Sequence, residues 1–155
     1  MKERAVIANQ TGTLIELYEK DETAWLEAMA ELATHGRAES LDLVNLAEFL
    51  ESMARRDRRA VFSRMVQLIM HLLKWQYQPD KRSGSWQASI SFQRMELHFE
   101  CDSGSLRQHA ASNLADAYDS AKAFAAKETG LDSAAFPDLC PYTLDELLAD
   151  TELPA

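Results

Sequence analysis

Histidines are the side chains of this sequence with the clearest potential for chemistry, because a neutral imidazole binds transition metals. Helical di-iron proteins carry Glu-x-x-His, a spacing that places both ligands on one side of a helix. The residues three before the four histidines are Leu32, Leu68, Met95 and Leu106, so that motif is absent. His71, His98 and His109 could still meet around one ion. A metal-dependent helical-bundle enzyme with hydrolase-like activity is therefore the alternative to a non-catalytic function for this chain.

Other catalytic signatures are missing. The sequence contains no G-x-S-x-G, no H-E-x-x-H, no GKS or GKT phosphate loop and no G-x-G-x-x-G. Cys101 and Cys140 stand 39 residues apart without a C-x-x-C motif, so neither a zinc site nor a thiol redox pair is indicated. We expect isolated thiols in a reducing, cytoplasmic setting, with no catalytic residue and no cofactor.

The charge of the chain is unevenly distributed. The net charge is −9, but the region from Arg55 to Arg82 holds eight Lys or Arg against Asp57 and Asp80, a net charge of +6, so the remainder carries −15. Such asymmetry could attract the acidic patch of a protein partner or satisfy the protein's own carboxylates. The acidic remainder disfavours nucleic acid as a partner. The candidate partner patch consists of Arg55, Arg56, Arg58 and Arg59.

A polar strip on the helix predicted over about residues 57–78 is the second candidate surface. Between Val61 and Tyr77 the apolar residues occupy an arc of roughly 220° at 100° per residue, which predicts a central helix with neighbours on most sides. The remaining arc is either a wet strip facing bulk water or the wall of a groove that could meet a ligand. The strip, with one residue of the following loop, consists of Arg64, Gln67, His71, Lys74, Gln78 and Arg82.

Helix start and stop residues position these surfaces. The first helical signal covers about residues 12–35, with Asp21 available as a cap if it breaks near Lys20 and with Gly36 placed to end it. Asp42 is placed to cap the next helix. Around residues 55–59 we predict a bend at which Asp57 caps a new helix, although a single helix over 42–78 stays open.

The loop after the central helix is expected to clamp the fold. Pro79 ends the helix, and Ser83 or Ser85 can cap the next one. Gln76 falls within the apolar arc, so we predict that its amide is buried and hydrogen-bonded to residues 79–85 or to the backbone of a neighbouring helix.

Residues 86–101 fit two descriptions. Trp86, Ala88, Ile90 and Phe92, followed by Met95, Leu97 and Phe99, alternate as in strands. In a helix the same segment has two apolar stripes. One stripe contains Trp86, Ile90, Leu97 and Cys101, and the nearly opposite one contains Ala88, Phe92, Met95 and Phe99. A helix with a second apolar face would lie between neighbours or form a homo-oligomer contact.

Two capping boxes mark the C-terminal part. Ser105 with Gln108 opens a helix that continues to a stop at Gly130, and Thr143 with Glu146 opens a short helix that we expect to strap across the bundle.

The chain resembles a known family along nearly its whole length. The segment HLLKWQYQPDKRSGSW, the preceding LDLVNLAEFLESMARRDRR, the opening LYEKDETAWLEAMAELATHGR and the closing TGLDSAAFPDLCPYTLDELL resemble the DUF29 family, a bacterial domain of unknown function. The resemblance implies a mainly helical fold and favours a helix for residues 86–101. It implies no catalytic residues.

Length and composition complete the prediction. A chain of 155 residues that is 46% hydrophobic can bury one sizeable core. It has no secretory signal pattern and no apolar run of about 18 residues, so we expect no membrane association. We predict one all-α domain over 1–155, a helical bundle around the central helix, and leave open whether residues 1–10 are ordered. Its function is unknown, and a non-catalytic cytoplasmic interaction or binding module fits best.

Overall fold

The described part of the chain, residues 13–149 with 153 and 154 of a computed structural model, consists of helices and connecting loops and contains no strand. The all-α prediction is confirmed, and the order of residues 1–10 lies outside the described residues. The chain divides into two compact units, Met1–Ala54 and Arg55–Ala155. Residues 13–20 are helical. They are followed by the helices α2 (Glu22–Thr34), α3 (Leu43–Tyr77), α4 (Gly84–Glu100), α5 (Gly104–Ser112), α6 (Leu114–Thr129) and α7 (Leu144–Leu148), with 3-10 helices η1 (Ala38–Ser40), η2 (Pro79–Lys81) and η3 (Ser133–Ala135).

The first unit is built around Trp25 of α2, which is fully buried. As predicted, the Asp21 side chain caps α2 by accepting from the backbone N–H of Ala24 at 3.0 Å. Gly36 follows the helix with φ of +67°, a left-handed conformation that favours glycine. The Trp25 ring contacts those of Tyr18 and Phe49 at centroid distances of 4.7 and 5.8 Å, so one aromatic cluster joins residues from three successive segments.

The predicted bend around residues 55–59 is wrong, because α3 is one helix of 35 residues from Leu43 to Tyr77. Arginine is a good helix former, and no Gly or Pro interrupts this stretch. Asp57 does not cap a new helix, and its carboxylate lies 3.5 Å from the guanidinium of Arg56. The central helix is therefore longer at its N-terminal end than the predicted range of about 57–78.

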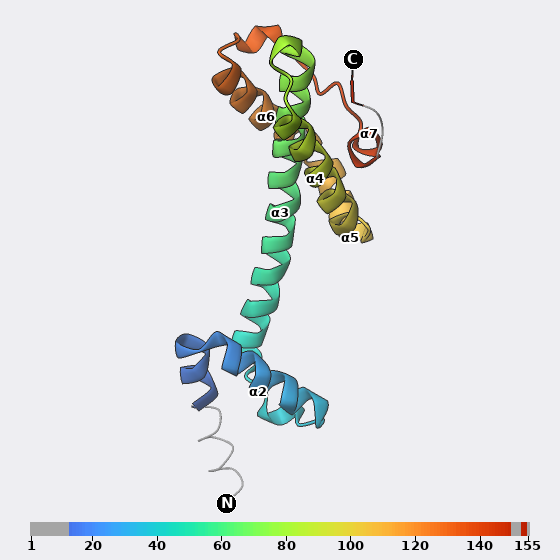
Figure 1. The fold of residues 1–155 in the computed structure, drawn as a ribbon. Coiled ribbons are helices and arrows are strands. Elements are labelled where there is room, and N and C mark those ends of the chain that lie inside the picture. Colours follow the sequence, from blue (N-terminus) through green and yellow to red (C-terminus); the bar gives the residue numbers. More distant parts are fainter. Residues whose placement is uncertain (1–12, 150–152, 155) are drawn as a thin grey trace, which may run out of the picture. The chain divides into compact units, whose positions relative to one another are not determined.

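In the second unit, α4, α5, α6 and α7 are grouped with the C-terminal half of α3 (Figure 1). Small residues on α6 allow close packing, since Ala117, Ala121 and Ala125 are all fully buried. The short helix α7 packs against α4, which confirms the predicted strap. The largest contribution to the core comes from α3, through Val61, Met65, Val66, Leu68, Ile69, Met70, Leu72 and Leu73.

Residues 86–100 lie within the single helix α4, and Cys101 is its C-cap, so the helix that the family resemblance implied is confirmed. The Ser83 hydroxyl caps α4 by accepting from the backbone N–H of Trp86 at 3.3 Å. One of the two apolar stripes supplies the core, because Ile90, Leu97 and Cys101 are buried.

Of the two capping boxes predicted beyond α4, the structure contains one. The box of Thr143 with Glu146 is present at the start of α7. The helix expected from Ser105 to Gly130 is instead two helices, α5 and α6, and Ser103 rather than Ser105 precedes the first. At the break, the Asn113 side-chain amide donates to the backbone carbonyl of His109 at 2.8 Å, which gives the chain an alternative to helical continuation.

Candidate functional site

Arg64 of the predicted polar strip is held by two carboxylates of α4. Its guanidinium lies 2.9 Å from Oε2 of Glu96 and 2.9 Å from Oε1 of Glu100, and its side chain is 25% exposed. The charge-assisted hydrogen bond from Nε to Glu100 and the ion pair with Glu96 fix both the arginine and the rotation of α4 about its axis. Arg64 thus neutralises the protein's own acidic groups.

Lys74 is likewise used inside the second unit. It is 8% exposed, and its Nζ donates to Oε2 of Glu128 on α6 at 2.5 Å. The same ammonium stands 4.6 Å from the centroid of the Trp86 ring on α4. Trp86 belongs to the apolar stripe that supplies the core, but it is only half-buried and its ring contacts this cation.

The C-terminal end of the strip is a helix-to-helix corner. The Gln78 side-chain amide donates to the backbone carbonyl of Thr129 at 3.3 Å. Arg82 donates from Nε to the backbone carbonyl of Trp75 at 2.9 Å, and its guanidinium lies 4.9 Å from the centroid of the Trp75 ring. Both side chains stabilise the end of α3 and the chain that follows it.

Gln67 and His71 form no ion pair with any residue that the structure describes. The ring Nδ1 of His71 lies 2.8 Å from the backbone carbonyl of Gln67 and donates to it. Gln67 lines an open hollow of about 280 Å³ together with Ser63, Arg64 and Gln93. The buried Oε1 of Gln93 has no hydrogen-bond partner in the part of the chain that the structure describes. Four of the six strip residues lie on α3 and two follow its end, and the polar groups of Arg64, Lys74 and Gln78 bind neighbouring helices.

Gln76 departs from its prediction. Its side chain is exposed, so the expected burial is wrong, and its Oε1 accepts from the Tyr142 hydroxyl at 3.1 Å rather than from residues 79–85. The turn before α7 brings Tyr142 to this position. The amide oxygen of this exposed side chain is thus satisfied by the chain that precedes α7, a contact that periodicity on α3 does not reveal.

Metal binding was the sharpest enzymatic alternative. Within residues 13–149, 153 and 154, the structure brings together no group of three or more His, Cys, Asp or Glu side chains that could hold a metal ion. His71, His98 and His109 therefore do not form the predicted alternative centre.

The two cysteines have the electrostatics of structural thiols. Burial raises the pKa of Cys101, which is 2% exposed, and it also raises the pKa of the half-buried Cys140. Cys140 donates from Sγ to the backbone carbonyl of Tyr142 at 3.3 Å. Because the thiolate is the nucleophile, a raised pKa opposes nucleophilic catalysis by either residue.

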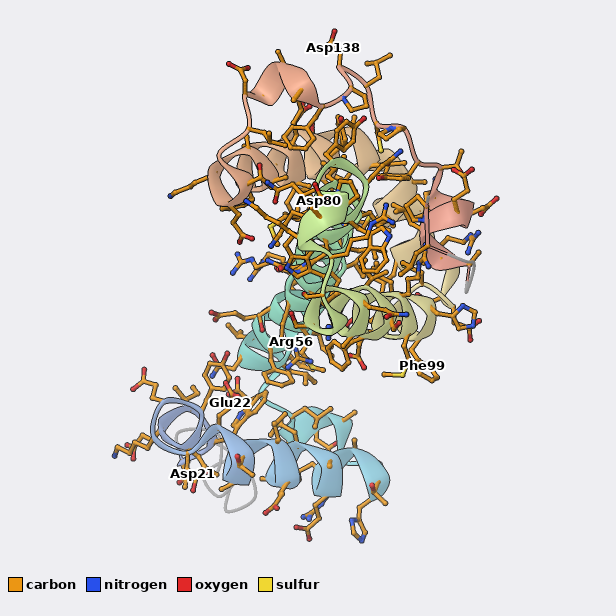
Figure 2. All side chains as sticks on the ribbon, turned by 45° about the horizontal axis from the view of Figure 1, so that its top comes forward. Asp21, Glu22, Arg56, Asp80, Phe99 and Asp138 are labelled. Carbon is orange, nitrogen blue, oxygen red and sulfur yellow. The ribbon has the colours of Figure 1, made fainter. Side chains whose placement is uncertain are left out.

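The arginines of the predicted basic patch on α3 are exposed to solvent, in contrast to Arg64 and Lys74 of the strip. Arg55, Arg56, Arg58 and Arg59 are all exposed, and Arg56 is seen on α3 in Figure 2. Arg56 contacts Asp57, whose side chain is itself 50% exposed. Arg58 and Arg59 form no ion pair with any residue that the structure describes. Their charges face solvent.

Sequence reasoning did not identify which apolar stripe of α4 would face outward. Phe92, Met95 and Phe99 are 51%, 48% and 70% exposed. The signal was present as a second stripe on the helix, but periodicity cannot tell which of two stripes a fold buries.

None of the helices in the described part of the chain is both long and apolar enough to cross a membrane.

Comparison with known proteins gives one match. No curated protein and no solved structure matches the chain. A family model described as "Domain of unknown function DUF29" matches residues 17–152 of the 155, which confirms the family resemblance. No activity accompanies this description, and the geometry favours no metal-dependent enzyme. The chain belongs to the DUF29 family.

Proposed function

We propose that this chain is a non-catalytic interaction module that binds an acidic patch of a protein partner through the basic patch of Arg55, Arg56, Arg58 and Arg59. The observation that carries the proposal is that all four arginine side chains are exposed on one continuous helix. Within residues 55–59 only Asp57 opposes them. Guanidinium groups bind carboxylates in paired hydrogen bonds, which suits recognition of an acidic surface.

Two other cations of the positive region are already neutralised. Arg64 is bound to Glu96 and Glu100, and Lys74 is bound to Glu128. The internal pairing that was one reading of the charge asymmetry therefore applies to Arg64 and Lys74, whereas Arg58 and Arg59 of the basic patch form no ion pair with any residue that the structure describes.

A folded protein fits this patch better than a nucleic acid does. The chain outside residues 55–82 carries a net charge of −15, which repels a long polyanion. A protein partner can present a local acidic patch to these arginines without extending along the acidic remainder of this chain. Binding of this kind is steered by charge and weakens as salt is added.

The proposed location is the cytoplasm. Both cysteines of the sequence are free thiols, which is typical of a reducing compartment. A bacterial source is supported by the family resemblance alone.

The test reverses the two charges that have no ion-pair partner among the described residues. Arg58→Glu with Arg59→Glu changes the net charge by −4, and Lys81→Glu with Lys127→Glu gives the same change at exposed positions outside the basic patch. We expect both double variants to unfold within about 0.5 kcal/mol of the wild type, since exposed positions tolerate such substitutions. A loss near 3 kcal/mol for the arginine pair would place these side chains in the fold instead.

Quantitative capture from the source cell, followed by direct titration of the purified partner, then measures binding. We expect an acidic protein that is retained by the wild type and the lysine variant and lost with the arginine variant and at high salt. Equal retention by all three proteins would refute the proposal. Retention that vanishes after nuclease treatment would show nucleic acid to be the ligand and would also refute it.

A further inference from the structure

The outward stripe of α4 has the pattern of a helix-pairing seam. Ala88, Phe92, Met95 and Phe99 follow one another at spacings of four, three and four, which is the a and d spacing of a coiled coil. Ala88 is exposed, and the three larger side chains are 48% to 70% exposed. Phe99 projects away from the helices of its unit near the C-terminal end of α4 (Figure 2).

The stripe is fixed in its outward orientation. On the opposite side of α4, Ile90 and Leu97 are fully buried in the core of the unit. Arg64 of α3 also binds both Glu96 and Glu100 of α4. Turning the phenylalanines inward would expose the buried residues and break both ion pairs, so the stripe is a lasting feature of the surface.

We propose that Phe92, Met95 and Phe99 form the centre of a homodimer interface, in which the stripe of one copy packs against the stripe of a second copy. This inference is independent of the basic patch, whose residues lie on α3.

The charges around the stripe favour a second copy as the occupant. At 100° per residue, the helix positions that flank it are Ser85, Ser89, Ser91, Glu96 and His98. The single carboxylate among them, Glu96, is bound by Arg64 at 2.9 Å. A second copy therefore meets the stripe without bringing like charges face to face, although each chain carries −9. A strongly charged partner would find few opposite charges here.

A groove lies beside the stripe, so this surface presents both projecting side chains and a recess. It has a volume of about 630 Å³ and lies between α4 and α7, where Met95, Phe99 and Leu148 contribute apolar walls. A two-fold interface requires each copy to present complementary features on one surface. Projecting aromatic rings next to an apolar groove meet that requirement.

The exposed apolar area of the stripe determines how tightly two copies are expected to bind. With exposed fractions of 51% and 70% on rings of roughly 200 Å², Phe92 and Phe99 offer about 240 Å² per copy. A stable dimer buries about 800 Å² per partner, so the groove and the flanking serines must supply the remainder. We therefore expect a weak dimer whose population depends on concentration.

Sedimentation equilibrium of the whole chain over a wide concentration range tests the proposal. The wild type should shift from the mass of a monomer to twice that mass as concentration rises. Phe92→Gln with Phe99→Gln should raise the dimer dissociation constant about tenfold or more, because buried aromatic residues dominate such interfaces. Glutamine is uncharged and forms helices well, so circular dichroism should show unchanged helical content.

Phe124→Gln is the matched control, because Phe124 is 50% exposed on a different helix, α6. This substitution should leave the dimer dissociation constant within about twofold of the wild-type value, because a residue outside the interface contributes little to binding. Salt should leave the dimer intact or strengthen it by screening the net charge. A wild type that stays monomeric throughout overturns the proposal and leaves a different protein as the occupant. A dimer that persists in the Phe92 and Phe99 variant, or that dissociates with salt and with Arg58→Glu and Arg59→Glu, also overturns it.

Discussion

The Nζ atom of Lys74 lies 2.5 Å from Oε2 of Glu128, in a pair whose lysine side chain is 10% exposed and whose glutamate side chain is 46% exposed. The pair joins α3 to α6, and the ring of Trp86 on α4 lies over the same ammonium. Such an arrangement is asymmetric, because removing the carboxylate leaves a cation with little access to water, whereas removing the cation leaves a carboxylate that water still reaches.

This asymmetry predicts unequal effects of the two substitutions. Glu128→Gln should lower the free energy of unfolding by about 1 to 3 kcal/mol, since the ammonium loses its charged acceptor. Lys74→Met should cost less, under about 1.5 kcal/mol, because a volume-conserving apolar side chain removes the buried charge as well. Urea denaturation followed by circular dichroism measures both. Arg107→Gln, which breaks an exposed pair with Asp145, is the control and should cost under about 1 kcal/mol. A larger loss for Lys74→Met than for Glu128→Gln would contradict this account.

Asp42 should be the most sensitive capping residue of the first unit. It is 4% exposed, and its carboxylate accepts from the Trp25 indole at 3.3 Å and from the Asn45 side chain at 2.6 Å. Asp42→Ala removes the cap of α3 and leaves the buried indole N–H without its acceptor, so we expect a loss of about 2 to 3 kcal/mol. Asp21→Ala, at an exposed cap, should cost only about 1 kcal/mol.

Amide hydrogen exchange distinguishes these two variants. Asp42→Ala should increase exchange in Glu22–Thr34 more than Asp21→Ala does, while exchange in Leu114–Thr129 of the second unit stays as in the wild type. Equal protection of α2 in Asp42→Ala and the wild type would show that the buried carboxylate contributes little.

The features that the sequence predicted correctly depend on neighbouring residues. Asp21, Asp42 and Thr143 each accept a hydrogen bond from an amide three residues further along the chain, so a short segment is enough to identify them. Helical periodicity likewise identified the core of α3, because its apolar residues lie within one continuous helix.

The wrong predictions concern competition between local and distant interactions. At residues 55–59 a capping Asp competed with helix continuation, and the helical propensity of arginine prevailed. Gln76 was expected to be buried because of its position on the helix, yet its partner Tyr142 comes from 66 residues away. Contacts of that range depend on how the chain turns after α6, which no local pattern encodes.

The polar strip shows the same limit for the candidate site. Helical spacing groups Arg64, Gln67, His71 and Lys74 on α3, but the sequence does not reveal that Glu96, Glu100 and Glu128 come within reach of Arg64 and Lys74. Tertiary packing thus determines which cations are left for a partner, and it leaves Arg58 and Arg59 of the basic patch without an ion pair among the described residues.

Tyr118 should make stability depend on alkaline pH. The residue is 1% exposed, its hydroxyl donates to the backbone carbonyl of Pro137 at 2.5 Å, and burial is the main cause that raises its pKa from 10.0 to about 12. The unfolded chain therefore releases this proton first. The contribution to stability is complete below pH 10 and is lost as the pH rises from 10 to about 12.

Tyr118→Phe isolates this effect. Below pH 10 the variant should be about 1 kcal/mol less stable, because the hydrogen bond to Pro137 is absent. Its free energy of unfolding should then fall less steeply than that of the wild type up to pH 12, with a residual slope from Tyr142, whose pKa burial also raises. Urea denaturation at a series of pH values measures both curves. Parallel curves would mean that the Tyr118 phenol titrates alike in the folded and unfolded chains, and would rule out its burial as the source of the alkaline sensitivity.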